Sequence, residues 1–155
     1  MILYLDTSAL VKRYVAEPGS AEVSEVISTA EMIGTALISR AEVAAALAKA
    51  VRVDALTREE ALASLQVFRG EWPDLVRVQV TELVVARADV FAWEHGLRGY
   101  DAVHLAAASL WQDAMNEQVT LSTFDRRLWA AAERVGLALH PANLPALLDA
   151  WEATR

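Results

Sequence analysis

The chain contains 155 residues, of which 55% are hydrophobic and 23% are charged, and it carries a formal net charge of −7. This composition excludes a disordered chain, and the length is that of one domain with a sizeable core. The negative charge argues against a protein that binds nucleic acid through backbone electrostatics alone. The lack of cysteine excludes disulfides, thiolate catalysis and thiolate metal ligands.

The N-terminus and the hydropathy pattern predict a cytoplasmic protein without membrane contact. No apolar run approaches the roughly 18 residues of a membrane span. Met1 leads directly into the apolar run Ile2 to Leu5, without the charged and apolar regions of a signal peptide. The lack of cysteine is also compatible with a reducing compartment.

The first half of the chain alternates short apolar runs with helix-like patterns. A break at Glu17-Pro18-Gly19-Ser20 separates the first two helical patterns. The expected elements are a strand at 2–5, a helix at 7–16, a helix at 20–31 capped by Ser20, a strand at 33–38 and an alanine-rich helix at 39–52.

The second half continues this alternation. Thr57 and Glu60 have the spacing of a capping box, and Gly96 and Gly136 end two of the later helices. The expected elements are a helix at 57–71, a strand at 75–80, helices at 81–95 and 100–115, a strand at 118–122, a helix at 124–135, a strand at 137–140 and a terminal helix. This alternation predicts an α/β fold, with one α/β/α domain over residues 1–155 and a parallel sheet flanked by helices.

Four acidic residues stand at the boundaries of these elements. Asp6 follows the first strand, and Glu42 lies in the first turn of the helix after the second. Asp101 opens the helix at 100–115, and Asp125 follows the strand at 118–122. Because ligands of parallel α/β sheets bind outside the carboxyl ends of the strands, we expect these acids to converge and to be catalytic.

Each acid also has a simpler structural interpretation. Asp6 can cap a helix, and Ser39 to Glu42 has the spacing of a capping box. Asp101 and Asp125 can complement helix dipoles. Each explanation suffices for one acid, but the ordered set of four would then be a coincidence.

A carboxylate cluster without sulfur or imidazole favours a hard divalent cation such as Mg²⁺ or Mn²⁺. Such an ion activates water and stabilises charge on a phosphoryl oxygen, as phosphodiester hydrolysis requires. His104, one turn after Asp101, is expected to be a buried or supporting histidine and not a ligand. The chain has no nucleophile elbow and no P-loop that would indicate another chemistry.

Basic and hydroxyl side chains accompany the acids. Arg13 and Arg126 are candidate contacts to the phosphates of a bound strand, with surface salt bridges as the alternative for each. Ser8 and Thr123 can hydrogen-bond an acid or a phosphate, or cap a helix. All four are therefore candidate substrate-binding residues.

Four motifs follow one another along the chain: LDTSALVKRY, SRAEVAAAL, YDAVHLAAA and LSTFDRRL. In this order and spacing they resemble the PIN domain, and more narrowly the VapC-type toxins of bacterial toxin–antitoxin pairs. The resemblance covers nearly the whole chain, and it lies in the ordered set because no single motif is specific.

The resemblance implies a parallel sheet of about four or five strands between helices. It also implies an endoribonuclease that uses Mg²⁺ or Mn²⁺ and leaves 5′-phosphate and 3′-hydroxyl ends on RNA. Asp6, Glu42, Asp101 and Asp125 match the family's acidic positions. Asp6 and Asp101 would be the most direct metal ligands, with Asp125 as a further one. The chain departs from many relatives at Thr123-Phe124-Asp125, where those carry an asparagine.

The resemblance further implies three partners. These are an RNA substrate, a second copy of the chain in a homodimer, and a cognate VapB-type antitoxin whose C-terminal segment blocks the site. The acidic net charge would suit a basic antitoxin tail. The tryptophans lie in expected helices or at their ends and are assigned to the core or to dimer contacts; they are Trp72, Trp93, Trp111, Trp129 and Trp151.

Two other functions compete with a nuclease. A receiver-type phosphoacceptor domain also has a parallel sheet and an acidic Mg²⁺ site. It needs a lysine after a late strand, whereas the lysines here are Lys12 and Lys49. A PIN scaffold without catalysis, acting in binding or assembly, is the second, and metal-dependent RNA cleavage would separate it from an enzyme.

Overall fold

The strands form one five-stranded parallel sheet with the order β3-β2-β1-β4-β5. A computed structural model describes all residues, 1–155. The strands are β1 (Ile2–Leu5), β2 (Met32–Ala36), β3 (Val76–Val78), β4 (Val119–Ser122) and β5 (Ala138–His140). The predicted α/β class with a parallel sheet is confirmed. β1 lies at the centre, so its carboxyl end opens into the middle of one sheet edge.

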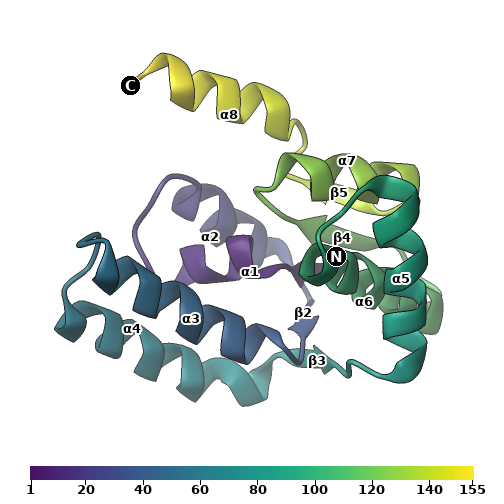
Figure 1. The fold of residues 1–155 in the computed structure, drawn as a ribbon, viewed down its shortest axis with the longest axis horizontal. Coiled ribbons are helices and arrows are strands. Elements are labelled where there is room, and N and C mark those ends of the chain that lie inside the picture. Colours follow the sequence, from purple (N-terminus) through teal and green to yellow (C-terminus); the bar gives the residue numbers. More distant parts are fainter.

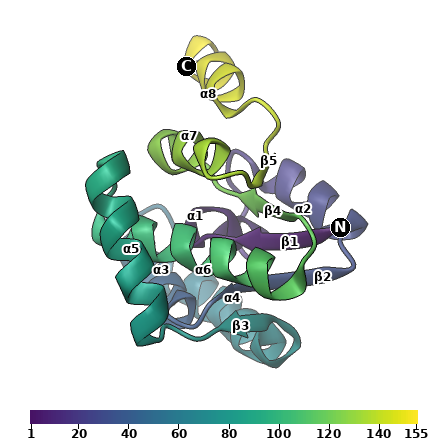
Figure 2. The ribbon, with the colours of Figure 1, turned by 90° about the vertical axis from the view of Figure 1, so that its right-hand side faces the viewer.

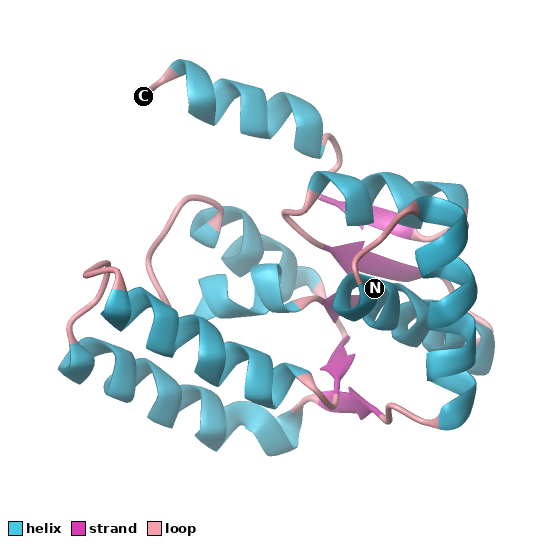
Figure 3. Cartoon of the chain, in the orientation of Figure 1, coloured by secondary structure: helices cyan, strands magenta, loops and turns pink.

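Eight α-helices and two 3₁₀ turns connect and cover the strands (Figures 1 and 3). The helices are α1 (Thr7–Leu10), α2 (Ser20–Thr29), α3 (Ser39–Arg52), α4 (Arg58–Glu71), α5 (Glu82–His95), α6 (Gly99–Met115), α7 (Arg126–Arg134) and α8 (Leu144–Ala153); the 3₁₀ turns are η1 (Val11–Arg13) and η2 (Trp72–Asp74). No helix is both long and apolar enough to cross a lipid bilayer.

The core consists of two clusters, one on each face of the sheet. Ile2 and Tyr4 of β1 pack with residues of α5, α6 and α7, whereas Leu3 and Leu5 pack with residues of α1 to α4. Successive side chains of a strand point to opposite faces, so this division follows from the strand geometry. Figure 2 shows α6 lying along the sheet, with α5 outside it.

Small residues let α6 lie close to the sheet. Its alanines Ala102 and Ala106 are fully buried. In β2, a Cβ atom on Gly34 would lie 2.7 Å from the ring of Trp111, closer than atoms can pack. Glycine at this position therefore makes room for the indole of α6.

Two expectations near the N-terminus are wrong. The helix expected at 7–16 is only α1 followed by η1, and just beyond η1 the carbonyls of Tyr14 and Val15 accept the hydroxyls of Ser64 and Ser20. Ser20 consequently does not cap α2; the N-cap is Gly19, with φ of 97°. The other elements match to within about two residues at most of their ends, the usual scatter of helix and strand boundaries.

Candidate active site

The acids singled out in the sequence lie at the carboxyl edge of the sheet. Asp6 follows β1 directly, and Asp125 is the N-cap of α7 just after β4. β1 and β4 are parallel neighbours, so these two segments leave the sheet side by side. Glu42 and Asp101 lie in the first turns of α3 and α6.

Asp6 is a buried carboxylate whose oxygens are held by the chain. Its side chain caps α1, because Oδ1 accepts the amide of Ala9 at 2.9 Å and the hydroxyl of Ser8 at 2.7 Å. Oδ2 accepts the hydroxyl of Thr123 at 2.6 Å. Burial nevertheless raises the pKa of Asp6 above its ordinary value, and these hydrogen bonds offset only part of that effect. The site therefore carries a charge that is costly without a cation.

Arg98 joins the next two acids. Its Nε donates to Oδ2 of Asp101 at 3.0 Å, and its Nη2 donates to Oδ2 of Asp125 at 3.1 Å. The other oxygen of Asp125 accepts the amide of Leu128 and caps α7. Asp101 and Asp125 are therefore close enough to be bridged by one guanidinium group.

The pKa of Asp101 is affected by the charges of two other carboxylates, those of Asp125 and Asp6. Burial raises it most, the hydrogen bond from Arg98 lowers it, and the charges of Asp125 and Asp6 raise it further. The net shift is upward. Asp6, Asp101 and Asp125 thus form one like-charged group.

Glu42 lies beside this group but has different partners. It forms no capping box, because Ser39 is inside α3 and the N-cap, Ile38, makes no side-chain bond. Its Oε1 instead accepts Nε2 of His104 at 2.7 Å and the hydroxyl of Thr7 at 2.9 Å. Burial acts to raise the pKa of Glu42, but these bonds outweigh it and lower the pKa.

A buried tyrosine completes this network, which the sequence analysis missed. The hydroxyl of Tyr4 lies 2.7 Å from Nδ1 of His104, and both residues are buried. A neutral His104 with its proton on Nε2 satisfies every partner: Tyr4 donates to Nδ1, and Nε2 donates to Glu42. His104 is a supporting histidine, as expected. Nothing in the sequence marked Tyr4 as part of the site, apart from its position in β1 on the face that packs against α6.

The candidate substrate-binding hydroxyls both support Asp6. Ser8 and Thr123 each donate to this carboxylate. Each also accepts a backbone amide, Ser8 from Phe124 and Thr123 from Asp125. The structure thus shows them bonded to an acid, one of the alternatives predicted for them.

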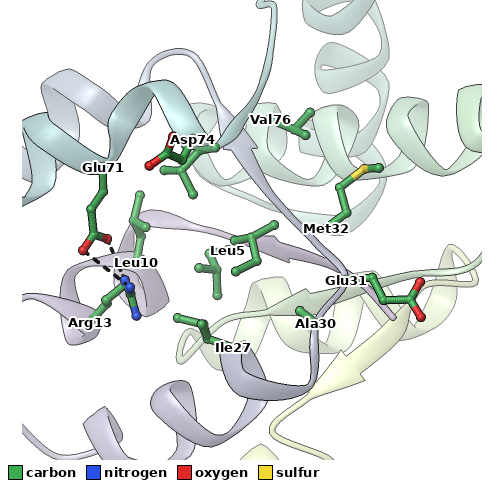
Figure 4. Close-up of a pocket in the computed structure, with 12 residues that line it drawn as sticks. Leu5, Leu10, Arg13, Ile27, Ala30, Glu31, Met32, Glu71, Asp74 and Val76 are labelled. Carbon is green, nitrogen blue, oxygen red and sulfur yellow. Dashed lines mark hydrogen bonds and ion pairs between the residues drawn. The ribbon is translucent and has the colours of Figure 1, made fainter.

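The candidate arginines are paired away from the acids. Arg13 donates to Glu71 at 2.8 Å, and Arg126 donates to Asp149 at 2.6 Å. Arg13 also lines a hollow of about 460 Å³ on the α2 side of the sheet (Figure 4). None of the four acids of the site lines that hollow, so the structure does not bring Arg13 and the acids together.

The acids do not form a ready ligand set. No group of three or more His, Asp or Glu side chains in the structure is arranged to hold a metal ion. The donor chemistry does fit a hard cation, because Asp6, Asp101 and Asp125 offer only carboxylate oxygens. The guanidinium group of Arg98 pairs with two of these oxygens, Oδ2 of Asp101 and Oδ2 of Asp125.

The sequence as a whole matches one protein family and several of its members. The PIN domain family matches residues 3–135. Two relatives from Mycobacterium tuberculosis are 34% identical over 92% of this chain and 97% of their own length; they are Ribonuclease VapC45 from strain CDC 1551 / Oshkosh and Ribonuclease VapC49 from strain ATCC 25618 / H37Rv.

Solved structures share the fold. FitAB bound to an IR36 DNA fragment has a TM-score of 0.64 and 18% identity, covering 89% of this chain and 93% of that one. VapBC2 from Rickettsia felis, bound to a promoter DNA fragment, has a TM-score of 0.60 and 19% identity, covering 90% and 98%. A toxin–antitoxin complex from Klebsiella pneumoniae has a TM-score of 0.60 and 17% identity, covering 84% and 91%.

A five-stranded parallel sheet with acids at its carboxyl edge, matched by one family over most of its length, defines the class: the chain belongs to the PIN-domain family. Within that family it groups with the VapC-type proteins, on the strength of the 34% identical relatives.

Proposed function

We propose that this protein is an endoribonuclease that hydrolyses RNA phosphodiester bonds, as the toxin of a VapBC-type toxin–antitoxin pair. The observation that carries the proposal is that Asp6, Asp101 and Asp125 come together at the carboxyl edge of the sheet. Thr123 donates to Asp6 and accepts the amide of Asp125, and Arg98 bridges Asp125 and Asp101. The names of the relatives as VapC ribonucleases support it. We take residues 1–155 as one domain, with α8 packed on α7 beyond the matched residues.

The proposed cofactor is Mg²⁺ or Mn²⁺, held by Asp6, Asp101 and Asp125. The charges of Asp6 and Asp125 raise the pKa of Asp101, so a cation bound between these carboxylates would remove that repulsion. When bound, such an ion supplies an activated water and stabilises charge on the phosphoryl oxygen. Mg²⁺ favours oxygen ligands and retains several waters, which suits an open carboxylate edge.

The residues of the chain would orient the acids and accept a proton. Ser8, Thr123 and the amide of Ala9 fix both oxygens of Asp6. Glu42 is held ionised by His104, whose bond lowers its pKa. Both bonds to Glu42 end on Oε1, so Oε2 is free to accept a proton from water.

We retain four proposed contacts to RNA, each with a condition that the structure sets. Arg13 would have to leave Glu71, and Arg126 would have to leave Asp149, before binding a phosphate. Both pairs are solvent-exposed, and exposed pairs are worth little, so exchange is cheap. Ser8 and Thr123 donate to Asp6, so their effect on bound RNA would be indirect, through the position of that carboxylate.

The proposed partners are a cognate VapB-type antitoxin and a second copy of the chain. Structural neighbours that are toxin–antitoxin complexes support the first. Exposed apolar side chains of α5 support the second. Coexpression with the reading frame beside its own gene should yield a complex that no longer cleaves RNA.

The function is tested by incubating purified protein with a labelled RNA pool, with Mg²⁺, with Mn²⁺ or with EDTA. Wild-type protein should cleave only with metal. Asp101→Asn should reduce cleavage by at least about a hundredfold, as expected when a group that stabilises transition-state charge is lost. The matched control is Asp113→Asn, an aspartate that also pairs with an arginine, Arg87, but outside the site.

Two results would overturn this proposal. Cleavage that persists in EDTA would show that the reaction does not depend on a metal ion. Absence of cleavage under every metal, from protein that still binds its antitoxin, would leave a PIN scaffold that acts in binding.

A further inference from the structure

Arg98 holds two acids of the site at once. It is the N-cap residue of α6 and lies one turn before Asp101. Its Nε is 3.0 Å from Asp101 Oδ2, and its Nη2 is 3.1 Å from Asp125 Oδ2. Asp125 is 27 residues further along the chain, so this bridge is a tertiary contact.

The arginine lies on the solvent side of the acids. Its side chain is 59% exposed, whereas those of Asp101 and Asp125 are 8% and 27% exposed. The more exposed group therefore covers the less exposed ones. The Arg98–Asp125 pair is the more exposed one, which contributes little to stability and is screened by salt, whereas the loss of the Asp101 bond has to be offset by the incoming cation.

The guanidinium group of Arg98 also contacts an aromatic ring beside the acids. The guanidinium carbon of Arg98 lies 4.8 Å from the ring centroid of Tyr100, which is itself an exposed residue. A cation over an aromatic face is attracted by the ring quadrupole. The side chain can keep this contact when its hydrogen bonds to the acids break.

The bridge occupies the oxygens that a cation would need. One charge of +1 sits on two carboxylates, and the structure contains no group of three acids arranged around a metal position. We propose that Arg98 is an internal counter-ion that competes with the divalent cation for Asp101 and Asp125, so that metal binds only as the guanidinium swings out. This inference rests on the proposed metal site.

The opposite role makes a different prediction. If Arg98 instead organised the acids for metal, its removal would weaken metal binding, because the carboxylates would lose their fixed geometry. If it competes, its removal strengthens binding, because the oxygens are free and the site is more negative by one charge. The direction of the change in affinity therefore distinguishes the two roles.

The test is Mn²⁺ binding by isothermal titration calorimetry, without RNA. Arg98→Gln should bind Mn²⁺ about three- to tenfold more tightly than wild type, the range set by loss of exposed charge-assisted bonds. Arg98→Lys keeps the charge but not the fork that spans two carboxylates, so its affinity should fall between the two.

Two further variants locate the effect. Arg87→Gln is the matched control, since Arg87 also bridges two side chains, Ser109 and Asp113, but away from the acids. It should bind Mn²⁺ as wild type does. Adding Asp101→Asn to Arg98→Gln should abolish the gained affinity.

Equal or weaker binding by Arg98→Gln would overturn the competition, as would a gain that survives Asp101→Asn. Either result leaves the nuclease proposal standing if wild-type protein still cleaves RNA with metal. If no variant binds Mn²⁺, the competition is overturned. The proposed function is overturned separately, if RNA is cleaved in EDTA or is not cleaved at all.

Discussion

Asp6 directly follows a buried strand, where the desolvation cost of an ionised carboxylate is high. It is 3% exposed and raises the pKa of the neighbouring Asp101. Hydrogen bonds from Ser8, Ala9 and Thr123 stabilise the ionised form, yet burial still raises the pKa of Asp6 itself. Such a residue weakens the metal-free protein, and the proposed cation would offset that cost.

Replacing Asp6 by asparagine should therefore leave metal-free protein as stable as wild type or more stable at neutral pH. A folded-state pKa above the ordinary 3.8 means that folding loses stability as pH rises through that pKa. The gain for Asp6→Asn should appear as a higher urea midpoint than that of wild type at neutral pH. It should shrink as pH falls toward 3.8.

Urea denaturation in EDTA at several pH values measures this difference. If Asp6→Asn unfolds at neutral pH, Asp6 is a structural residue and its place in the catalytic group is wrong.

His104 acts on the site through Glu42. It is 1% exposed, and its two ring nitrogens face Tyr4 and Glu42. A phenylalanine there would leave the buried Tyr4 hydroxyl unpaired, at about 1–3 kcal/mol, and free the Glu42 carboxylate to turn.

His104→Phe should thus lower both stability and RNA cleavage, the latter by about tenfold or more, as for residues that orient catalytic groups. His104→Gln retains a donor for Glu42 and should recover most of the cleavage but less of the stability. Paired kinetics and denaturation curves measure both effects. Equal activity of the two variants would show that His104 is merely part of the core.

Among the elements, those defined by local chemistry were predictable. The capping box of Thr57 and Glu60 starts α4, and the left-handed Gly96 ends α5, as expected. The early end of α1 at Leu10 could not be predicted from local sequence, and the chain beyond η1 is held from afar, because the carbonyl of Tyr14 accepts the hydroxyl of Ser64, 50 residues away.

The same limit applies to the site. Acids at strand ends were visible as candidates because their positions follow from element boundaries. Their partners were not: His104 meets Glu42 across 62 residues, and Arg98 meets Asp125 across 27. Long-range pairing depends on how whole elements pack, which hydropathy patterns leave open.

The terminal helix α8 is fixed by few contacts. It lies beyond α7, at the edge of the molecule (Figure 1). Trp151 stacks on Phe124 with ring centroids 6.0 Å apart and 12° between the ring planes. Asp149 pairs with Arg126 at 2.6 Å. Because Phe124 follows Thr123, this stack joins α8 to the segment that carries Asp125.

Trp151→Ala should destabilise the protein by about 1–2 kcal/mol, the combined effect of lost stacking and partial burial. Trp151→Phe keeps an aromatic face and should lose less than half of that. Guanidinium denaturation followed by circular dichroism gives both values. Identical stability of the two variants would show that the stack does not hold α8.

On the scale of the whole molecule, α5 presents an apolar stripe to solvent. Leu83, Val90 and Trp93 recur at helical spacing and are 65%, 48% and 90% exposed. A contiguous exposed stripe with a tryptophan is typical of an interface. Trp93 is therefore not a core residue, and the proposed homodimer places it at the interface.

Sedimentation analysis should show a dimer for wild type and a monomer for Trp93→Glu, with unchanged helical content. The control is Val67→Glu, which changes an apolar residue of α4 that is 54% exposed. A wild-type monomer at all concentrations, or a dimer of Trp93→Glu, would contradict an interface on α5.

The central claim is that Asp6, Asp101 and Asp125 together bind the cation that supports RNA cleavage. Anomalous diffraction from crystals soaked in Mn²⁺ tests it most directly. We expect a manganese peak bound by oxygens of Asp6 and Asp101, with Arg98 turned away from Asp125. A peak elsewhere in the molecule, or no peak with Arg98 still bridging both acids, would contradict it.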